Sequence, residues 1–396
     1  MSGLRISSEP RESADDDDDS QLQKQGAFLP SSDLPSNASQ EQLLTLLVAL
    51  AAGIRQENGE EPPGNMLSCV ANCDVGKVNI LTTAVGVGSS FTVRAVRNFS
   101  ERAEERRLVF KSSMPFNYGH SERDARRKLV DVTLELRALS HPTLRNHENI
   151  VKLLGLGWDT DVFEPEQKKW PVLILDYADG GTLRDLLQRQ LLLSYEEKAH
   201  LCLDVMRGLS VLHECGIIHG DLKLENILVF TRDEYINDES SRRWIAKLAD
   251  FGGAITDMDQ DGRGRILRTG TPPWNAPEWK SRLNDIQLTR TDVYSLGFVI
   301  WRVMASGANL FIDAHQFFPG LPLLTDRVAL NNAVEVLKKD GVNFLACVRR
   351  AGRSKFSQVN FEQVDDLLGL TLQFDPGQRD LRAAIDVLKE FSSPRR

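Results

Sequence analysis

The stretch 217–229, which reads IIHGDLKLENILV, constrains this chain most, because it crowds polar side chains into one short loop between a helix-like run and an apolar strand. Asp221 can accept a proton from a hydroxyl group, and Lys223 can neutralise negative charge that develops nearby. Asn226 follows Asp221 by five residues and offers an amide oxygen to a hard divalent cation. Asp and Asn after a helix also serve as ordinary turn formers, so this loop alone leaves both interpretations open.

Composition excludes several other classes of protein. A chain of 396 residues with 41% hydrophobic and 26% charged residues can bury a large core. Its net charge of -8 argues against a nucleic-acid protein built on a basic face. The five cysteines are odd in number and mostly far apart, which predicts a reducing compartment and no disulfide scaffold.

The N-terminal region is expected to lie outside the main domain. Residues 1–40 are polar with an acidic run at 15–19, and we predict a disordered acidic tail. Ser39 to Gln42 form a capping box ahead of an apolar helix at 43–54, in an N-terminal extension of residues 41–76. That helix is too short to cross a bilayer and lacks the flanks of a signal peptide. We expect it to pack on the domain.

Upstream of the central loop, a Gly-x-Gly pair and a lysine-bearing strand follow each other. Gly86 and Gly88 lie between two strand-like runs, where backbone amides can cover a phosphate. Lys111 ends the strand expected at 107–112, and Glu135 lies on the helix expected at 121–140. Further strands are expected at 79–85, 150–156, 172–175 and 244–249, and a further helix at 194–214.

Downstream, four motifs appear in a fixed order. Asp250, Phe251 and Gly252 form a D-F-G sequence, and residues 270–278 read GTPPWNAPE. The sequence TDVYSLG at 291–297 and DPGQR at 375–379 follow. Each motif alone is compatible with a helix cap or a surface charge, whereas their order and spacing together are specific.

From about Val78 to Phe391 the chain resembles the eukaryotic-type protein kinase superfamily, whose catalytic loop reads H-R-D-L-x-x-x-N. The resemblance implies an α+β, two-lobed kinase fold at 77–396, with a small β-rich N-lobe (about 77–176) that holds one helix and a larger, mainly helical C-lobe (about 177–396). Lys223, two residues after Asp221, is the form of the serine/threonine branch. Gly220 replaces the usual Arg, which makes this a divergent, non-RD form.

The resemblance also implies a role for each matching residue. Asp221 and Lys223 would be catalytic, and Asn226 and Asp250 would bind Mg²⁺. Thr269, Thr271 and Glu278 would belong to the activation segment, with structural roles for His219, Phe251 (stacked with Leu139 and Leu153 in an apolar column), Asp292 (anchoring the catalytic-loop backbone) and Arg379 (paired with Glu278). ATP would be bound by Val85, Gly86, Gly88, Val93, Val109, Lys111 (paired with Glu135), Asp176, Ala178 and Leu228, with Leu175 as gatekeeper.

Three functions remain open at this point. The first is an active protein serine/threonine kinase acting on Ser or Thr of a protein substrate. The second is a small-molecule phosphotransferase of the aminoglycoside or choline kinase type, which often carries H-G-D in this loop but lacks the A-P-E segment. The third is a pseudokinase scaffold, favoured by Phe91 in place of a glycine and by Val109 in place of alanine. The first is favoured because every catalytic residue is present.

Control and location follow as expectations. Because Gly220 removes the buried guanidinium that an activation-loop phosphate would neutralise, phosphorylation of Thr269 is expected to contribute little. A monomer without nucleic-acid or membrane partners is expected, in the cytoplasm or nucleus, since the sequence shows no signal peptide or transmembrane segment.

Overall fold

The computed structural model describes residues 47, 82–87, 92–97, 107–112, 122–160, 169–189, 191–232, 242–256, 263–321 and 326–392. The acidic tail predicted at 1–40 lies outside these residues, as do Gly88 and Phe91. Of the apolar helix predicted at 43–54, Leu47 alone is described; it is helical and fully buried. Among the described helices, none is both long and apolar enough to cross a membrane.

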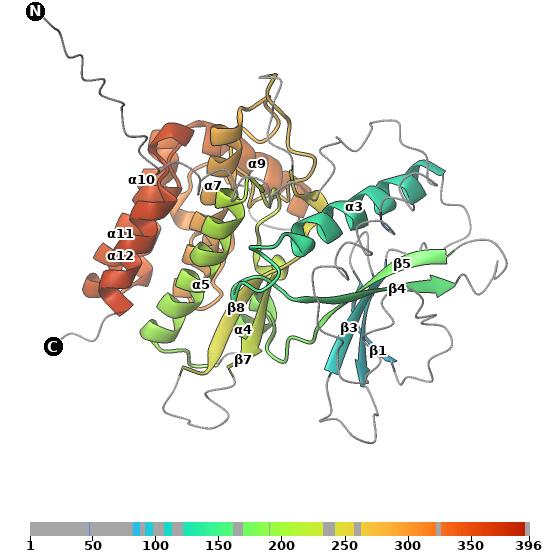
Figure 1. Ribbon diagram of the computed structural model, residues 1–396. Helices are drawn as coiled ribbons and strands as arrows, with labels where there is room; N and C mark the ends of the chain where they lie inside the picture. The colour runs from blue at the N-terminus through green and yellow to red at the C-terminus, as the bar shows by residue number, and fades with distance from the viewer. Residues whose placement is uncertain are drawn as a thin grey trace, which may run out of the picture. The chain divides into compact units, whose positions relative to one another are not determined.

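The first part of the described chain is a five-stranded antiparallel sheet in the order β1-β2-β3-β5-β4, accompanied by one long helix, α3 (Figure 1). Neighbours in the sequence form the pairs β1–β2, β2–β3 and β4–β5, whereas α3 and β4 lie in the sequence between the paired strands β3 and β5. The elements are β1 (Thr82–Val87), β2 (Thr92–Arg97), β3 (Arg107–Ser112), α3 (Glu122–Ser140), β4 (Leu153–Thr160) and β5 (Lys169–Asp176).

Strand alternation decides which side chains of this sheet face the site. Leu108 and Phe110 of β3 pack with Val172 and Ile174 of β5 in one buried cluster. Successive side chains of a strand point to opposite faces, so Val109 and Lys111 must point away from that cluster. Val109 stands opposite Leu175, and Lys111 opposite Leu173, in the β3–β5 register.

Helix α3 is amphipathic, as its sequence predicts. Leu129, Val132, Leu136 and Leu139 recur every three or four residues and are all buried. Arg137 lies in the last turn, where a positive charge is favourable to the helix dipole.

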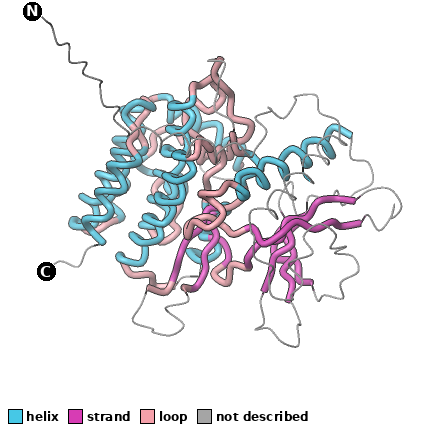
Figure 2. Tube along the Cα trace, in the orientation of Figure 1, coloured by secondary structure: helices cyan, strands magenta, loops and turns pink. Residues whose placement is uncertain are grey.

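The second part is a three-stranded sheet, β6-β7-β8, surrounded by helices; Figure 2 shows the strands in magenta and the helices in cyan. This arrangement confirms the expected two-lobed α+β fold. The elements are β6 (Gly181–Thr182), α4 (Leu183–Gln188), α5 (Tyr195–Glu214), β7 (Ile227–Thr231), β8 (Trp244–Leu248), α7 (Asp285–Met304), α8 (Leu310–Asp313), α9 (Arg327–Lys339), α10 (Gly341–Lys355), α11 (Gln358–Thr371) and α12 (Leu381–Ser392).

The turn before β4 joins the two sheets through backbone hydrogen bonds. Val151 N donates to Leu248 O (2.9 Å), and Leu248 N donates to Asn149 O (2.8 Å). The strand predicted at 150–156 therefore begins later, at Leu153, because residues 149–151 pair with β8 and not with β5. A Cβ on Gly208 of α5 would lie 2.8 Å from Asn149 O, so only glycine permits this close approach.

Helix α7 starts at Asp285, six residues before the TDVYSLG motif. Asn284 caps the helix, and Gln287 completes a capping box, which is a start signal that the motif itself does not contain. Thr291 and Asp292 are therefore the seventh and eighth residues of the helix, about two turns from its start, and both are buried. The helix thus presents Asp292 from a rigid, fully covered position.

Candidate active site

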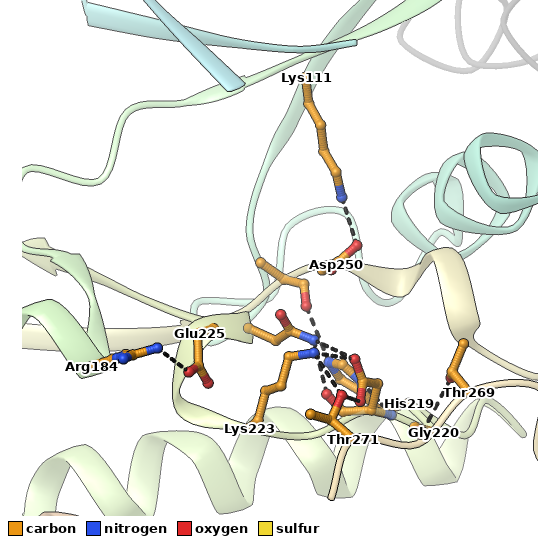
Figure 3. A network of polar contacts seen from close by, with 12 residues as sticks. Lys111, Arg184, His219, Gly220, Lys223, Glu225, Asp250, Thr269 and Thr271 are labelled. Atoms are coloured by element: carbon orange, nitrogen blue, oxygen red, sulfur yellow. Dashed lines mark hydrogen bonds and ion pairs between the residues drawn. The ribbon is translucent and has the colours of Figure 1, made fainter. Parts of the chain in front are cut away.

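A buried lysine bridges the two sheets. Lys111 on β3 contacts both carboxylate oxygens of Glu135 on α3, with Nζ–Oε distances of 2.8 and 2.7 Å. The same Nζ lies 2.7 Å from Oδ1 of Asp250, which follows β8 (Figure 3). The pairing of Lys111 with Glu135, expected from the sequence, is thus present in the structure, and Asp250 completes a three-residue cluster.

Charge in this cluster follows from burial and proximity. Burial acts to lower the pKa of Lys111, but Asp250 and then Glu135 outweigh it and hold that pKa above its usual value, so Lys111 is a cation. Burial raises the pKa of Glu135 to about 7 against the opposing effect of Lys111. Burial also acts to raise the pKa of Asp250, yet Lys111 lowers it overall, which keeps Asp250 ionised.

The Asp221 carboxylate is held by Lys223 and Thr271, and Asn226 Nδ2 makes a longer contact with its Oδ2 (3.4 Å). Lys223 Nζ lies 2.5 Å from Asp221 Oδ2, and the Thr271 hydroxyl donates to Asp221 Oδ1 at 2.7 Å (Figure 3). Lys223 Nζ also donates to the Thr271 hydroxyl at 2.9 Å. A carboxylate offers about four lone-pair positions, so Asp221 retains capacity to accept a proton from an incoming hydroxyl. Thr271 from the activation segment thus orients the candidate base.

Asn226 and Asp250 form a donor set that suits magnesium. Asn226 Nδ2 donates to the backbone oxygen of Asp221 (2.8 Å), which fixes the amide and leaves its oxygen as the potential ligand atom. Asp250 is 39% exposed and can present a carboxylate oxygen. Mg²⁺ prefers one or two carboxylates together with substrate phosphates over a cage made only of protein ligands. One amide oxygen and one carboxylate that line the same cleft match this preference.

The loop backbone is anchored from α7 by a single carboxylate. Asp292, 1% exposed, accepts hydrogen bonds from His219 N (2.8 Å) and Gly220 N (2.9 Å). His213 Nε2 lies 3.0 Å from the same carboxylate. Gly220 has φ +75°, a left-handed conformation that suits glycine far better than the arginine that usually stands here. The expected anchoring contact of Asp292 is therefore present.

The His219 ring packs on Phe251, with ring centroids 5.3 Å apart. His219 Nε2 also contacts Ala249 O at 3.1 Å, which links the catalytic loop to the chain that precedes Asp250. Leu139 is buried and Leu153 is half-buried, and their stacking on these rings in the expected apolar column stays a prediction. Asp250 itself has φ +65°, a conformation that Asp tolerates better than most residues.

These side chains meet in one cleft of about 960 Å³. Its size lies within the range of small-molecule sites. His219, Phe251, Glu278, Asp292 and Arg379 do not line it, in agreement with the structural roles expected for four of them. Gly86 and Val85 lie on β1, in a strand whose side chains are not described. The residues expected in the site that line the cleft are Val93, Val109, Lys111, Glu135, Leu175, Asp176, Ala178, Asp221, Lys223, Asn226, Leu228, Asp250, Thr269 and Thr271.

Glu278 and Arg379 form a buried bidentate ion pair. Arg379 is fully buried and its two terminal nitrogens bind the two carboxylate oxygens of Glu278, one of them at 3.0 Å. The guanidinium stacks over Tyr294 of α7 at 4.7 Å. This pair fastens the end of the activation segment to the helical core.

Sequence reasoning missed three polar contacts, two of them at the cleft and one away from it. Arg268 binds Asp131 of α3 (3.1 Å), and Arg184 of α4 binds Glu225 (2.8 Å). The fully buried Lys338 of α9 donates to Asn275 O at 2.7 Å. Four-residue spacing between Asp131 and Glu135 on the α3 helix was the one available signal, because it placed both on one face. The other contacts join distant segments and have no local sequence signature.

Comparison with known proteins agrees with this geometry. Residues 83–379 match the sequence model of the family described as protein kinase domain. The chain is 33% identical to the serine/threonine-protein kinase pakA of Dictyostelium discoideum over 181 residues, which are 45% of this chain and 13% of that protein. It is 37% identical to the serine/threonine/tyrosine-protein kinase HT1 of Arabidopsis thaliana over 163 residues, which are 40% of this chain and 35% of that protein.

A third relative is the serine/threonine-protein kinase CST20 of Candida albicans, 28% identical over 172 residues, which are 43% of this chain and 12% of that protein. The alignments thus span about a third or less of the length of each relative. The family match, in contrast, extends from β1 to Arg379 and covers most of the chain. This chain therefore belongs to the protein kinase domain family.

Proposed function

We propose that this protein transfers the γ-phosphoryl group of ATP to serine and threonine hydroxyls of a protein substrate. The observation that carries the proposal is the convergence of Lys111, Glu135, Asp250 and the Asp221–Lys223–Asn226 loop on one cleft. Phosphoryl transfer depends on positioning and charge stabilisation, and these residues supply both.

In the proposed reaction, the oxygen of the substrate hydroxyl attacks the γ-phosphorus while Asp221 accepts the proton of that hydroxyl. The bond between the γ-phosphorus and the bridging oxygen breaks, and ADP leaves. Lys223, held by Asp221 and Thr271, would offset the charge of the transferring group. Asn226 and Asp250 would hold Mg²⁺, which neutralises phosphate charge when bound.

Nucleotide recognition is assigned to the opposite side of the cleft. Val93, Val109 and Leu228 would cover the adenine, and the backbone of Asp176 and Ala178 would bind its polar edge. Gly86 in β1, with Val85 and Gly88, would cover the phosphates. Lys111 would contact the α- and β-phosphates, and its bond to Glu135 fixes it for that contact.

Preference for Ser and Thr rests on Lys223 and on its bond to Thr271, which joins the activation segment to the base. Relatives described as serine/threonine-protein kinases support the same preference. HT1 is described as a serine/threonine/tyrosine-protein kinase, so tyrosine belongs in the assay as an acceptor.

The test uses purified full-length chain, labelled ATP, magnesium, and a peptide library with Ser, Thr and Tyr acceptors. We expect transfer to Ser and Thr, and a loss of about 10²-fold or more in Asp221→Asn and in Lys111→Met. Asp386→Asn, which removes one exposed carboxylate on α12, is the matched control and is expected to retain wild-type activity.

The alternative functions predict other outcomes. ATP binding by the wild-type chain without transfer to any acceptor would overturn the proposal and favour a pseudokinase. Transfer to aminoglycosides or choline but to no peptide would favour the small-molecule reaction. Wild-type activity in Asp221→Asn would refute the role assigned to that residue.

A further inference from the structure

An ion pair joins the activation segment to α3 directly. Arg268 Nη2 lies 3.1 Å from Oδ1 of Asp131, although the two residues are 137 positions apart in the sequence. Both line the cleft, together with Arg127, one turn earlier on α3. Figure 1 shows α3 beside the β1–β5 sheet. Because Arg127, Asp131 and Glu135 of this helix line the cleft, a contact that holds α3 also holds these side chains.

Asp131 lies at a packed junction. It is 8% exposed, and a Cβ on Gly252 would come within 3.2 Å of the Asp131 Cβ, so the helix rests against the chain that follows Asp250. Burial raises the pKa of Asp131, and Arg268 and then Arg127 oppose this effect. The charge of Asp131 is therefore compensated mainly by Arg268.

Asp131 and Glu135 share one face of α3, because residues four apart lie one above the other on a helix. Glu135 carries the bond to Lys111, while Asp131 carries the bond to Arg268. The same face thus meets β3 through one carboxylate and the activation segment through the other. A change in the position of α3 would disturb both contacts together.

We propose that Arg268 and Asp131 are positioning residues: their ion pair holds α3 so that Glu135 stays bonded to Lys111, without any phosphate on the activation segment. The inference rests on the proposed kinase function, since its catalytic consequence is the orientation of ATP phosphates by Lys111. In the unmodified chain, this ion pair connects the activation segment to α3.

Loss of Arg268 leaves a nearly buried carboxylate without its main partner. Such a carboxylate must take up a proton or move toward water, and either change weakens the contact of α3 with residues 251–253. Arg268 is 38% exposed, so solvent screens part of the interaction. We therefore expect a moderate effect, roughly fivefold to thirtyfold in kcat for peptide phosphorylation, rather than a complete loss.

The experiment compares wild type, Arg268→Gln, Asp131→Asn and the double variant, with Arg268→Lys as the conservative change. Both single variants are expected to lower kcat by similar factors while the peptide KM stays within about twofold. The kcat of the double variant is expected to be no lower than that of either single variant, since both substitutions remove the same ion pair. Arg263→Gln, which removes an exposed arginine of the same segment, is the matched control and is expected to match wild type.

A second measurement needs no catalysis. Amide hydrogen exchange of the peptides that cover α3 is expected to rise in Arg268→Gln and Asp131→Asn, while exchange in α5 and α7 stays unchanged. Unchanged exchange in α3 would overturn the inference whatever the activities are. If the wild type itself transfers no phosphate while α3 still loosens in the variants, the proposed function fails and the ion-pair tie stands.

The route through Glu135 is tested in a Glu135→Gln background. There, Arg268→Gln is expected to lower kcat by less than about twofold, because the contact between residue 135 and Lys111 that Arg268 supports is already impaired. An equal loss in both backgrounds would show that Arg268 acts elsewhere, for example on the peptide. A peptide KM that rises while kcat holds would likewise place Arg268 on the peptide and overturn the inference.

Discussion

Replacing Arg379 by methionine should destabilise the helical lobe more than any exposed charge change. Arg379 is fully buried and binds Glu278 through two nitrogens. It also donates to three backbone oxygens, those of Gln373 (2.7 Å), Phe374 (3.0 Å) and Arg290 (3.0 Å). Methionine fills a similar volume but supplies none of these hydrogen bonds.

The magnitude follows from what remains after the change. Glu278 is only 15% exposed at its side chain, so its carboxylate would be left largely buried and unpaired. Breaking such a buried pair typically costs about 3–5 kcal/mol. In Glu278→Gln, the buried Arg379 cation loses one carboxylate bond but keeps its three backbone acceptors and one bond to the amide oxygen, so we expect a smaller cost of about 2 kcal/mol, the value of one hydrogen bond to a charged group.

Equilibrium unfolding in urea measures these differences. Wild type, Arg379→Met and Glu278→Gln are compared with Lys389→Met, which removes one partner of the exposed Lys389–Asp386 pair (3.6 Å) and should cost less than about 0.5 kcal/mol. A cost within about 1 kcal/mol for Arg379→Met would refute the reasoning. So would equal costs for Arg379→Met and Glu278→Gln, because the backbone bonds would then contribute nothing.

Three further predictions concern the metal, the activation segment and pH. Calorimetry should show tighter ATP binding with Mg²⁺ than with EDTA in wild type, and a smaller difference in Asp250→Asn; equal affinities in wild type would count against a metal site. Thr269→Ala should keep activity within about threefold of wild type, since the Thr269 hydroxyl makes only a 3.4 Å contact with Gly220 O. Thr269→Glu should lose tenfold or more in activity, because the site is crowded: a Cβ on Gly253 would already lie 2.9 Å from Thr269 Cγ2. Activation by the glutamate would contradict this. Burial lowers the pKa of Lys338 from 10.5 to about 8, so between pH 8 and pH 10.5 the unfolded chain binds a proton that the folded chain lacks. The free energy of unfolding of wild type relative to Lys338→Met should therefore rise by roughly 2 kcal/mol from pH 8 to pH 10. A difference in urea unfolding free energies that does not change with pH would refute this prediction.

Much of the site could be predicted from the sequence because its parts lie in short segments with fixed local geometry. The loop that holds Asp221, Lys223 and Asn226 is one continuous stretch, and its internal bonds form between residues two to five positions apart. The pairing of Lys111 with Glu135 spans 24 residues and rested on the resemblance, yet strand alternation in β3 independently places Lys111 away from the apolar cluster.

Contacts between distant segments could not be predicted in the same way. Arg268 and Asp131 both looked like ordinary surface charges in the sequence, and only the fold brings them together. The same holds for Lys338, a lysine on an amphipathic helix, which is fully buried because Asn275 O and Glu335 (3.0 Å) satisfy its ammonium group. Buried charge depends on partners supplied by other elements, and periodicity carries no information about them.

Gly220 shows how the departure from the family pattern fits the rest of the structure. Its positive φ and the 3.2 Å distance from a Cβ at this position to Gly253 O mean that any larger residue would strain the loop. Asp292 already binds the backbone nitrogen of Gly220, so this turn is fixed from α7 without help from a side chain. Loop geometry and activation-segment position are thus held by contacts of the unmodified chain, from Asp292 on one side and from Arg268 on the other. An arginine at position 220 would add a charge and a Cβ that crowds Gly253 O, in a backbone conformation that favours glycine, so the glycine is better understood as part of this self-sufficient arrangement than as a lost catalytic feature.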